Sequence, residues 1–97
     1  MAESHEIRYA DEAVADLRPL RAFDQRKVLD GIQQHLTFQP KFISRSRIKL
    51  MDQPFWSQYR LRLDEIRVYY DVDDEARIIN ILRVLIKTTG TTPGESP

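Results

Sequence analysis

The residues of this chain best suited to chemistry are three arginines around a break in an alternating sequence. Apolar and other residues alternate along residues 59–72 (YRLRLDEIRVYYDV), and the alternation is interrupted at residues 64–65. Period-two alternation on both sides of a two-residue break predicts a tight antiparallel hairpin with one buried face. In this register Arg62 lies opposite Arg67, and Arg60 lies on the same, open face.

This predicted pairing places two guanidinium groups in direct opposition. Like charges opposite each other on a sheet are unfavourable, by roughly a few tenths to 1 kcal/mol per pair. An anion bound between Arg62 and Arg67 relieves the repulsion, and a phosphate or an acidic side chain of a partner is suitable. A single surface arginine is usually solvated or ion-paired. The interpretation as an anion-binding site therefore rests on the cluster of arginines rather than on any one of them. Side chains of this open face are expected to be replaceable without loss of the fold.

Two helices are predicted before the hairpin. The first has Asp11 as its N-cap, and Pro19 ends it. The second has Asp24 as its N-cap, and Phe23 is expected to pack on Val28 as a hydrophobic staple. The expected apolar faces are Ala10, Val14 and Leu17 in the first helix, and Val28, Leu29, Ile32 and Leu36 in the second.

Strands are predicted at residues 6–9, 47–51 and 78–86 besides the hairpin, and the last is apolar enough for a central strand. Helices placed before a run of antiparallel strands indicate an α+β fold. We expect a small single domain, with a helical hairpin on one face of a three- or four-stranded, mainly antiparallel sheet. If Leu82, Val84 and Ile86 face the helices, Arg83 and Lys87 join the arginines on the open face. The domain is expected to span residues 1–88, followed by a flexible polar tail at 89–97.

Composition limits the remaining possibilities. The chain has 97 residues, 41% of them hydrophobic, which supports one small core. Without cysteine it can form neither disulfides nor thiolate metal sites, and we expect no metal or cofactor. We see no secretory leader and no apolar run long enough for a bilayer, so a cytoplasmic protein without a membrane partner is expected.

The charge is balanced over the chain but unevenly placed. The formal net charge is zero and the pI is about 6.7, which is low for a protein whose main ligand is nucleic acid. Residues 41–70, however, contain seven Lys or Arg against three Asp or Glu. A local patch of this kind attracts anionic ligands whatever the overall sum.

These motifs together resemble the RelE/ParE superfamily of type II toxin–antitoxin toxins, over roughly residues 5–88. The shared pattern is a weak strand, a helical hairpin, a basic strand (YRLRL), a tight turn (DE), a strand reading IRVYYDV and an apolar strand ending in a basic residue (INILRVLIK). The resemblance implies a toxin with a cognate antitoxin, able to form a heterotetramer with it. RelE-like members are endoribonucleases that mostly cut messenger RNA on the ribosome, whereas ParE-like members poison DNA gyrase.

The resemblance to RelE-like ribonucleases also implies a set of catalytic residues. These are Arg60, Arg62, Arg67 and Lys87. Lys49, Tyr69 and Arg83 are further candidates for RNA-binding or accessory roles. The implied reaction is attack of a ribose 2′-hydroxyl on its own 3′-phosphate, giving a 2′,3′-cyclic phosphate and a 5′-hydroxyl. It requires cations on the phosphate, a proton acceptor at the 2′-oxygen and a proton donor at the leaving oxygen.

The sequence leaves the proton acceptor and the activity open. RelE-like ribonucleases usually place a Tyr, His or Glu beyond the last strand, where this chain reads TTGTTPGESP. Tyr69, Lys49 and Lys87 are the candidates in its place. A RelE-like messenger RNA interferase that arrests growth by inhibiting translation is favoured, with a gyrase poison or a catalytically silent binding module as alternatives. Phe55 and Trp56 are interpreted as core or partner-groove residues rather than a platform for a nucleobase.

Overall fold

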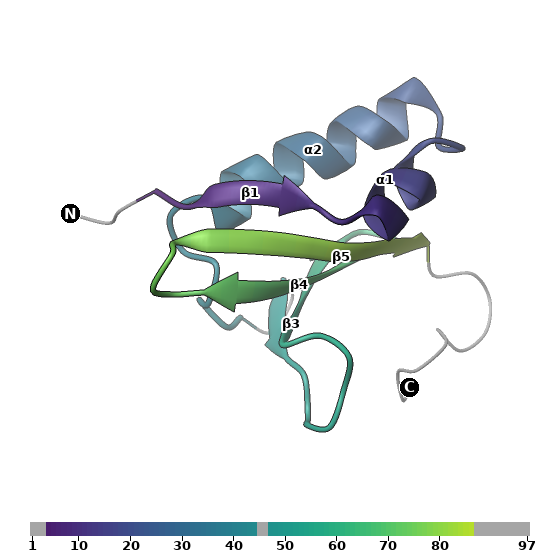
Figure 1. Cartoon of the computed structure of the whole chain (residues 1–97). Helices are drawn as coiled ribbons and strands as arrows, with labels where there is room; N and C mark the ends of the chain where they lie inside the picture. Colours follow the sequence, from purple (N-terminus) through teal and green to yellow (C-terminus); the bar gives the residue numbers. More distant parts are fainter. Residues whose placement is uncertain (1–3, 45–46, 87–97) are drawn as a thin grey trace.

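The structure, a computed structural model, describes residues 4–44 and 47–86, and these form two helices packed on one sheet (Figure 1). The elements are β1 (Glu6–Tyr9), α1 (Asp11–Leu17), α2 (Ala22–Leu36), β2 (Ile48–Leu50), β3 (Tyr59–Leu63), β4 (Ile66–Asp73) and β5 (Ile78–Ile86). The sheet has five strands in the order β1-β5-β4-β3-β2. β1 runs parallel to β5, and the other neighbours are antiparallel. The predicted α+β fold is confirmed, with β1 and β2 as the two edge strands of a sheet larger than expected.

The β3–β4 hairpin has the predicted register. Arg62 pairs with Arg67, and Leu63 pairs with Ile66 across the two-residue turn. Asp64 in that turn has a φ of 56°, in the left-handed region that aspartate tolerates better than most residues. The alternation of the sequence therefore translates directly into one buried and one open face.

β5 contains an irregularity that the alternation did not predict. Tyr69 pairs with Arg83, whereas Tyr70 pairs with Ile81, so Leu82 is an extra residue in the ladder. Val84 remains in the core, but Leu82 is only half-buried and lies outside the core cluster. The expectation that Leu82 faces the helices was wrong, because the extra residue of the bulge shifts the alternation of side chains between the two faces of β5.

The helices begin earlier than predicted. Ala10, not Asp11, is the N-cap of α1, and Ala13 rather than Val14 is its fully buried residue. Arg21 is the N-cap of α2, and the backbone N–H of Gln25 already donates to its carbonyl oxygen. Starting this turn earlier lets the Gln25 amide cap α1, because its Nε2 donates to the carbonyl of Leu17 at 2.8 Å.

One consequence is that the predicted hydrophobic staple does not form. Phe23 is 71% exposed, while Val28, Ile32 and Leu36 are fully buried. Leu29, predicted to belong to the same stripe, is also exposed. In the described part of the chain, neither helix has the combination of length and apolarity needed to cross a bilayer.

The core lies between the helices and the inner face of the sheet. Tyr70 is fully buried in it, and its ring stacks on that of Tyr59 with centroids 5.5 Å apart. The Tyr70 hydroxyl donates to the carbonyl oxygen of Pro40 at 2.5 Å, and burial raises the pKa of this phenol. Tyr59 is partly buried and packs against the same core cluster. Other buried residues of the cluster are Ala13, Val28, Ile32, Leu36, Ile48, Leu61, Leu63, Ile66, Val68, Val72, Ile79, Ile81 and Val84.

α2 approaches the sheet closely at Gly31. A β-carbon added there would lie 2.6 and 2.7 Å from the two methyl carbons of Leu63. A glycine inside a helix costs about 1 kcal/mol relative to alanine. At this position it permits the helix to lie directly on β3.

We predict that Gly31→Ala does not give the usual stabilisation of a helix interior. The propensity gain of about 1 kcal/mol is opposed by overpacking against Leu63, so the net change in unfolding free energy should lie between about zero and 2 kcal/mol of destabilisation. In a Leu63→Ala background the same substitution should stabilise. Urea unfolding of the four proteins measures this coupling, and an equal gain in both backgrounds would contradict the close contact.

Candidate functional site

The open face of the sheet carries two rows of basic positions that run across the strands. In the first row Lys49 of β2 lies opposite Arg60 of β3, and the row continues through Tyr69 of β4 to Arg83 of β5. The second row contains the Arg62–Arg67 pair. The sequence assigned all of these positions except Lys49 to the open face.

Arg47 extends the second row and was missed as a site residue. The backbone N–H of Arg62 donates to the carbonyl oxygen of Arg47 at 2.7 Å, and Nη1 of Arg47 donates to the carbonyl oxygen of Arg62 at 3.2 Å. A signal was present, because Arg47 and Lys49 alternate with Ile48 and Leu50 as the hairpin residues do. We call the set of Arg47, Lys49, Arg60, Arg62, Arg67 and Arg83 the cationic face.

The members of the cationic face differ in accessibility. Arg47, Lys49 and Arg62 are exposed, and Arg60 is half-buried. Arg67 is only 5% exposed, because it lies on an inner strand and its Nη1 donates to the carbonyl oxygen of Asp64 at 2.7 Å. Arg67 is therefore on the predicted face, but the expectation that it is accessible was wrong.

Tyr69 lies on the predicted face, but it is fully buried. The ring of Trp56 lies 4.6 Å from it and that of Phe55 lies 6.0 Å from it, both measured between centroids. The two residues belong to the loop between β2 and β3, which projects away from the helices (Figure 1). In this arrangement Tyr69 supports other aromatic rings and does not itself present a stacking surface, which corrects its predicted accessory role.

Arg83 also lies on the predicted face, but it is paired within the chain. Its Nε and Nη2 donate to the two carboxylate oxygens of Asp16 at 2.7 and 3.0 Å, and this contact raises the pKa of Arg83. Asp16 additionally accepts a hydrogen bond from the backbone N–H of Val84 at 2.9 Å. β1 pairs with β5 only as far as Ile81, so α1 and its Asp16 cover the strand edge beyond that point.

Lys87, the remaining predicted catalytic residue, lies outside the described residues, as does the predicted tail at 89–97. Among the described residues no cluster of His, Cys, Asp or Glu is placed to bind a metal ion. The structure thus brings Arg60, Arg62 and Arg67 together with Lys49 and adds Arg47 to them.

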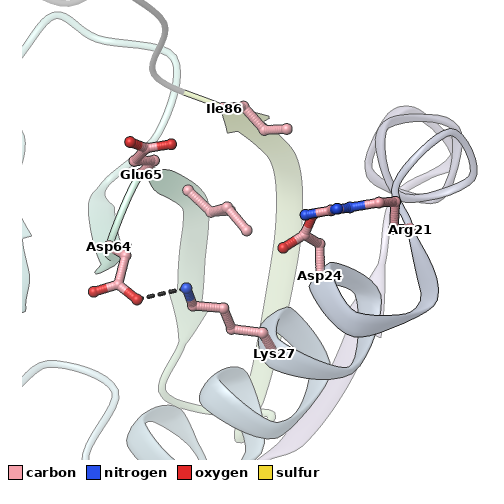
Figure 2. A pocket seen from close by; sticks show the side chains of 7 residues that line it. Arg21, Asp24, Lys27, Asp64, Glu65 and Ile86 are labelled. Atoms are coloured by element: carbon pink, nitrogen blue, oxygen red, sulfur yellow. Dashed lines mark ion pairs between the residues drawn. The ribbon is translucent and has the colours of Figure 1, made fainter.

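The turn that carries the arginine pair is anchored to α2. Lys27 reaches from α2 to the Asp64 carboxylate, with Nζ 2.5 Å from Oδ2, across a pocket of about 300 Å³ (Figure 2). Lys27 holds the pKa of Asp64 below its usual range, and Arg47 and Arg62 lower it further. Asp64 therefore connects the turn to the helix through its side chain and to Arg67 through its carbonyl.

Comparison with known proteins agrees with this fold. The matching family is described as the ParE toxin of the type II toxin–antitoxin system, parDE, and the match covers residues 7–88. No curated protein matches the sequence. The fold and the match define a toxin of the type II toxin–antitoxin class. Within that class the chain belongs to the RelE/ParE family.

Solved structures of similar fold are RelE-type toxins. The RelBE2 toxin–antitoxin complex from Mycobacterium tuberculosis has a TM-score of 0.75 at 24% identity, covering 87% of this chain and 99% of that one. The RelE–RelB complex from Pyrococcus horikoshii has a TM-score of 0.71 at 22% identity, with 90% and 99% covered. The isolated E. coli RelE toxin has a TM-score of 0.68 at 15% identity, with 90% and 88% covered. At these identities the likeness is one of fold.

The depressed pKa of Asp64 predicts a pH-dependent contribution to stability. A carboxyl whose pKa is lower in the folded state than in the unfolded state stabilises the fold above its unfolded pKa of about 3.9, and this stability is lost as the pH falls through the lower folded value. In thermal unfolding from pH 2 to 7, the melting temperature of the wild type should exceed that of Asp64→Asn at neutral pH. The two melting temperatures should converge in acid. Asparagine also tolerates the left-handed backbone, so a pH-independent difference would contradict the ion pair.

The two paired arginines should differ in their effect on stability. Arg67→Ala removes a buried side chain and leaves the Asp64 carbonyl without this donor, so we expect a loss of about 1–3 kcal/mol in unfolding free energy. Arg62→Ala, on the exposed side of the pair, should change it by less than about 0.5 kcal/mol. Urea unfolding of both variants tests this. Equally small changes in unfolding free energy would show that the burial of Arg67 does not contribute to stability.

Proposed function

We propose that this toxin is a RelE-like endoribonuclease of the cytoplasm that cleaves messenger RNA on the ribosome and so inhibits translation. The observation that carries the proposal is the accessible guanidinium of Arg62, placed between Arg47 and Arg67 on the open face. Within the described residues no carboxylate pairs with Arg62 or Lys49. Both cations are therefore available to the phosphates of a bound strand.

The geometry supports a division of roles between the two central arginines. Arg67 is held by the turn carbonyl of Asp64, so its guanidinium is fixed before substrate arrives. Arg62 is exposed and can close on a phosphate from the other side. Together they suit the stabilisation of the charge that develops on phosphorus when the 2′-oxygen attacks, since a preorganised cation needs no rearrangement during the reaction.

Proton transfer is assigned to Lys49, because Tyr69 is buried beneath Trp56. Lys49 is exposed and lies opposite Arg60, next to the arginine pair. A ribosome that holds messenger RNA in a fixed geometry contributes the orientation that a small open face does not supply alone. This is the reason for proposing the ribosome as part of the reaction.

Inhibition of DNA gyrase is the second candidate function, and two observations favour it. The family that matches is that of the ParE toxin. Arg83, which a ribonuclease would use for RNA, is engaged by Asp16 in a bidentate ion pair. Under this alternative the toxin acts by binding gyrase and does not hydrolyse a phosphodiester.

An antitoxin is proposed as the partner under either activity. The similar structures from M. tuberculosis and P. horikoshii are toxin–antitoxin complexes. Acidic side chains of an extended antitoxin segment complement Arg62 and Lys49, and their binding would compete with RNA. A heterotetramer of two toxins and two antitoxins is the proposed assembly.

We predict that Arg62→Gln abolishes toxicity through loss of cleavage. Removing one hydrogen-bond donor to a transition-state anion typically lowers the rate by about a hundredfold or more. Cleavage is measured by primer extension on messenger RNA bound to purified ribosomes, and gyrase supercoiling is measured in parallel. Arg26→Gln, which removes the same charge from the exposed surface of α2, is the matched control and should cleave like the wild type.

Two outcomes would contradict the ribonuclease assignment. Intact messenger RNA together with inhibited supercoiling would establish the gyrase alternative. Intact messenger RNA and normal supercoiling, from a toxin that still binds its antitoxin, would indicate a member that acts by binding alone.

A further inference from the structure

The loop between β2 and β3 places a tryptophan against the first row of the cationic face. Trp56 packs on Tyr69, and Tyr69 lies in the first row between Arg60 and Arg83. Neighbouring strands are about 4.8 Å apart, so the indole is within one or two strand spacings of both arginine positions. An aromatic side chain flanked by cations is the arrangement that single-stranded nucleic acids bind.

Two other aromatic rings pack against the indole. Its centroid lies 4.8 Å from that of Phe55, with an interplanar angle of 28°, and 4.6 Å from that of Tyr69, with an angle of 50°. Even so, 43% of Trp56 remains exposed. The ring is therefore held in place before a ligand arrives, and little conformational entropy is lost when a second ring stacks on it.

The exposed side of Trp56 opens into a pocket that can receive a planar group. The pocket measures about 390 Å³, and Trp56 lines it together with Ala10, Glu12, Leu82 and Arg83. Leu82 reaches this face because it is the bulge residue of β5. The bulge therefore supplies an apolar wall at the side of the indole.

We propose that Trp56 is the stacking platform for a nucleobase of single-stranded RNA whose phosphates lie along Lys49, Arg60 and Arg62. The proposal rests on the proposed function in that RNA is the ligand of this face, but it does not require that the RNA is cut. A base on Trp56 and a phosphate at Arg60 or Arg62 match one strand of nucleic acid crossing the two rows. Trp56 is thus a binding residue rather than a core residue.

The experiment uses the fact that Trp56 is the single tryptophan of the chain. The full-length toxin is titrated with a 2′-O-methyl RNA hexamer, which the proposed 2′-hydroxyl chemistry cannot cleave. Stacking of a base on the indole should quench its fluorescence. An abasic hexamer with the same phosphates should bind through the arginines and leave the fluorescence almost unchanged.

A variant then measures how much the ring contributes to binding. Base–aromatic stacking energies predict that Trp56→Leu weakens binding of the hexamer by about fivefold to a hundredfold. The affinity is measured by the fluorescence anisotropy of a labelled strand. Affinity for the abasic hexamer should not change. Phe23→Leu is the matched control, since Phe23 is an exposed aromatic residue on α2. Trp56→Phe keeps a ring in the loop and should give a smaller loss, so the test survives if the leucine variant misfolds.

The outcomes separate this inference from the proposed function. Quenching and Trp56-dependent affinity without cleavage of messenger RNA on the ribosome would support the platform and overturn the nuclease assignment. Cleavage that needs Arg62 but is unaffected by Trp56→Leu, with hexamer affinity within twofold of wild type, would overturn the platform alone. Loss of antitoxin binding in Trp56→Leu with unchanged RNA affinity would place Trp56 in a protein interface and also overturn it.

Discussion

The register of the β3–β4 hairpin is the constraint on which the other features of this molecule depend. Side chains alternate between the two faces of a sheet, so a slip of one residue would bring Arg62 and Arg67 into the core and expose Leu61 and Val68. The two-residue turn fixes that register, with Asp64 in a left-handed conformation. Core packing and the cationic face are thus set by the same short segment.

Contacts from outside the sheet stabilise the turn between β3 and β4. Lys27 of α2 pairs with the Asp64 carboxylate, while the Asp64 carbonyl accepts from Arg67. α2 reaches the sheet because Gly31 leaves room for Leu63. The helix packing on one face therefore influences the position of a guanidinium on the other, through a chain of direct contacts.

Although the net charge is zero, the basic side chains fall into two groups. Some are paired with carboxylates, and others are exposed and available to bind anions. Arg83 and Lys27 are each paired with a carboxylate from another element, Asp16 and Asp64. Among the described residues, Lys49 and Arg62 have no such carboxylate and are exposed. Anions are attracted to a local patch of this kind even though the whole chain is neutral. A pI of about 6.7 is therefore compatible with the proposed nucleic-acid ligand.

The sequence by itself determined the hairpin, the strand at residues 78–86, the α+β class and the face on which Arg60, Arg62 and Arg67 lie, because local alternation, an apolar run and the order of the elements encode them. It did not determine which of these arginines is accessible. Three features of the site require residues distant in the chain to meet. These are the burial of Arg67, the ion pair of Arg83 with Asp16 and the packing of Trp56 over Tyr69. The bulge at Leu82 likewise depends on how β5 fits β4. Periodicity specifies which face a side chain takes, but only tertiary packing specifies what covers it.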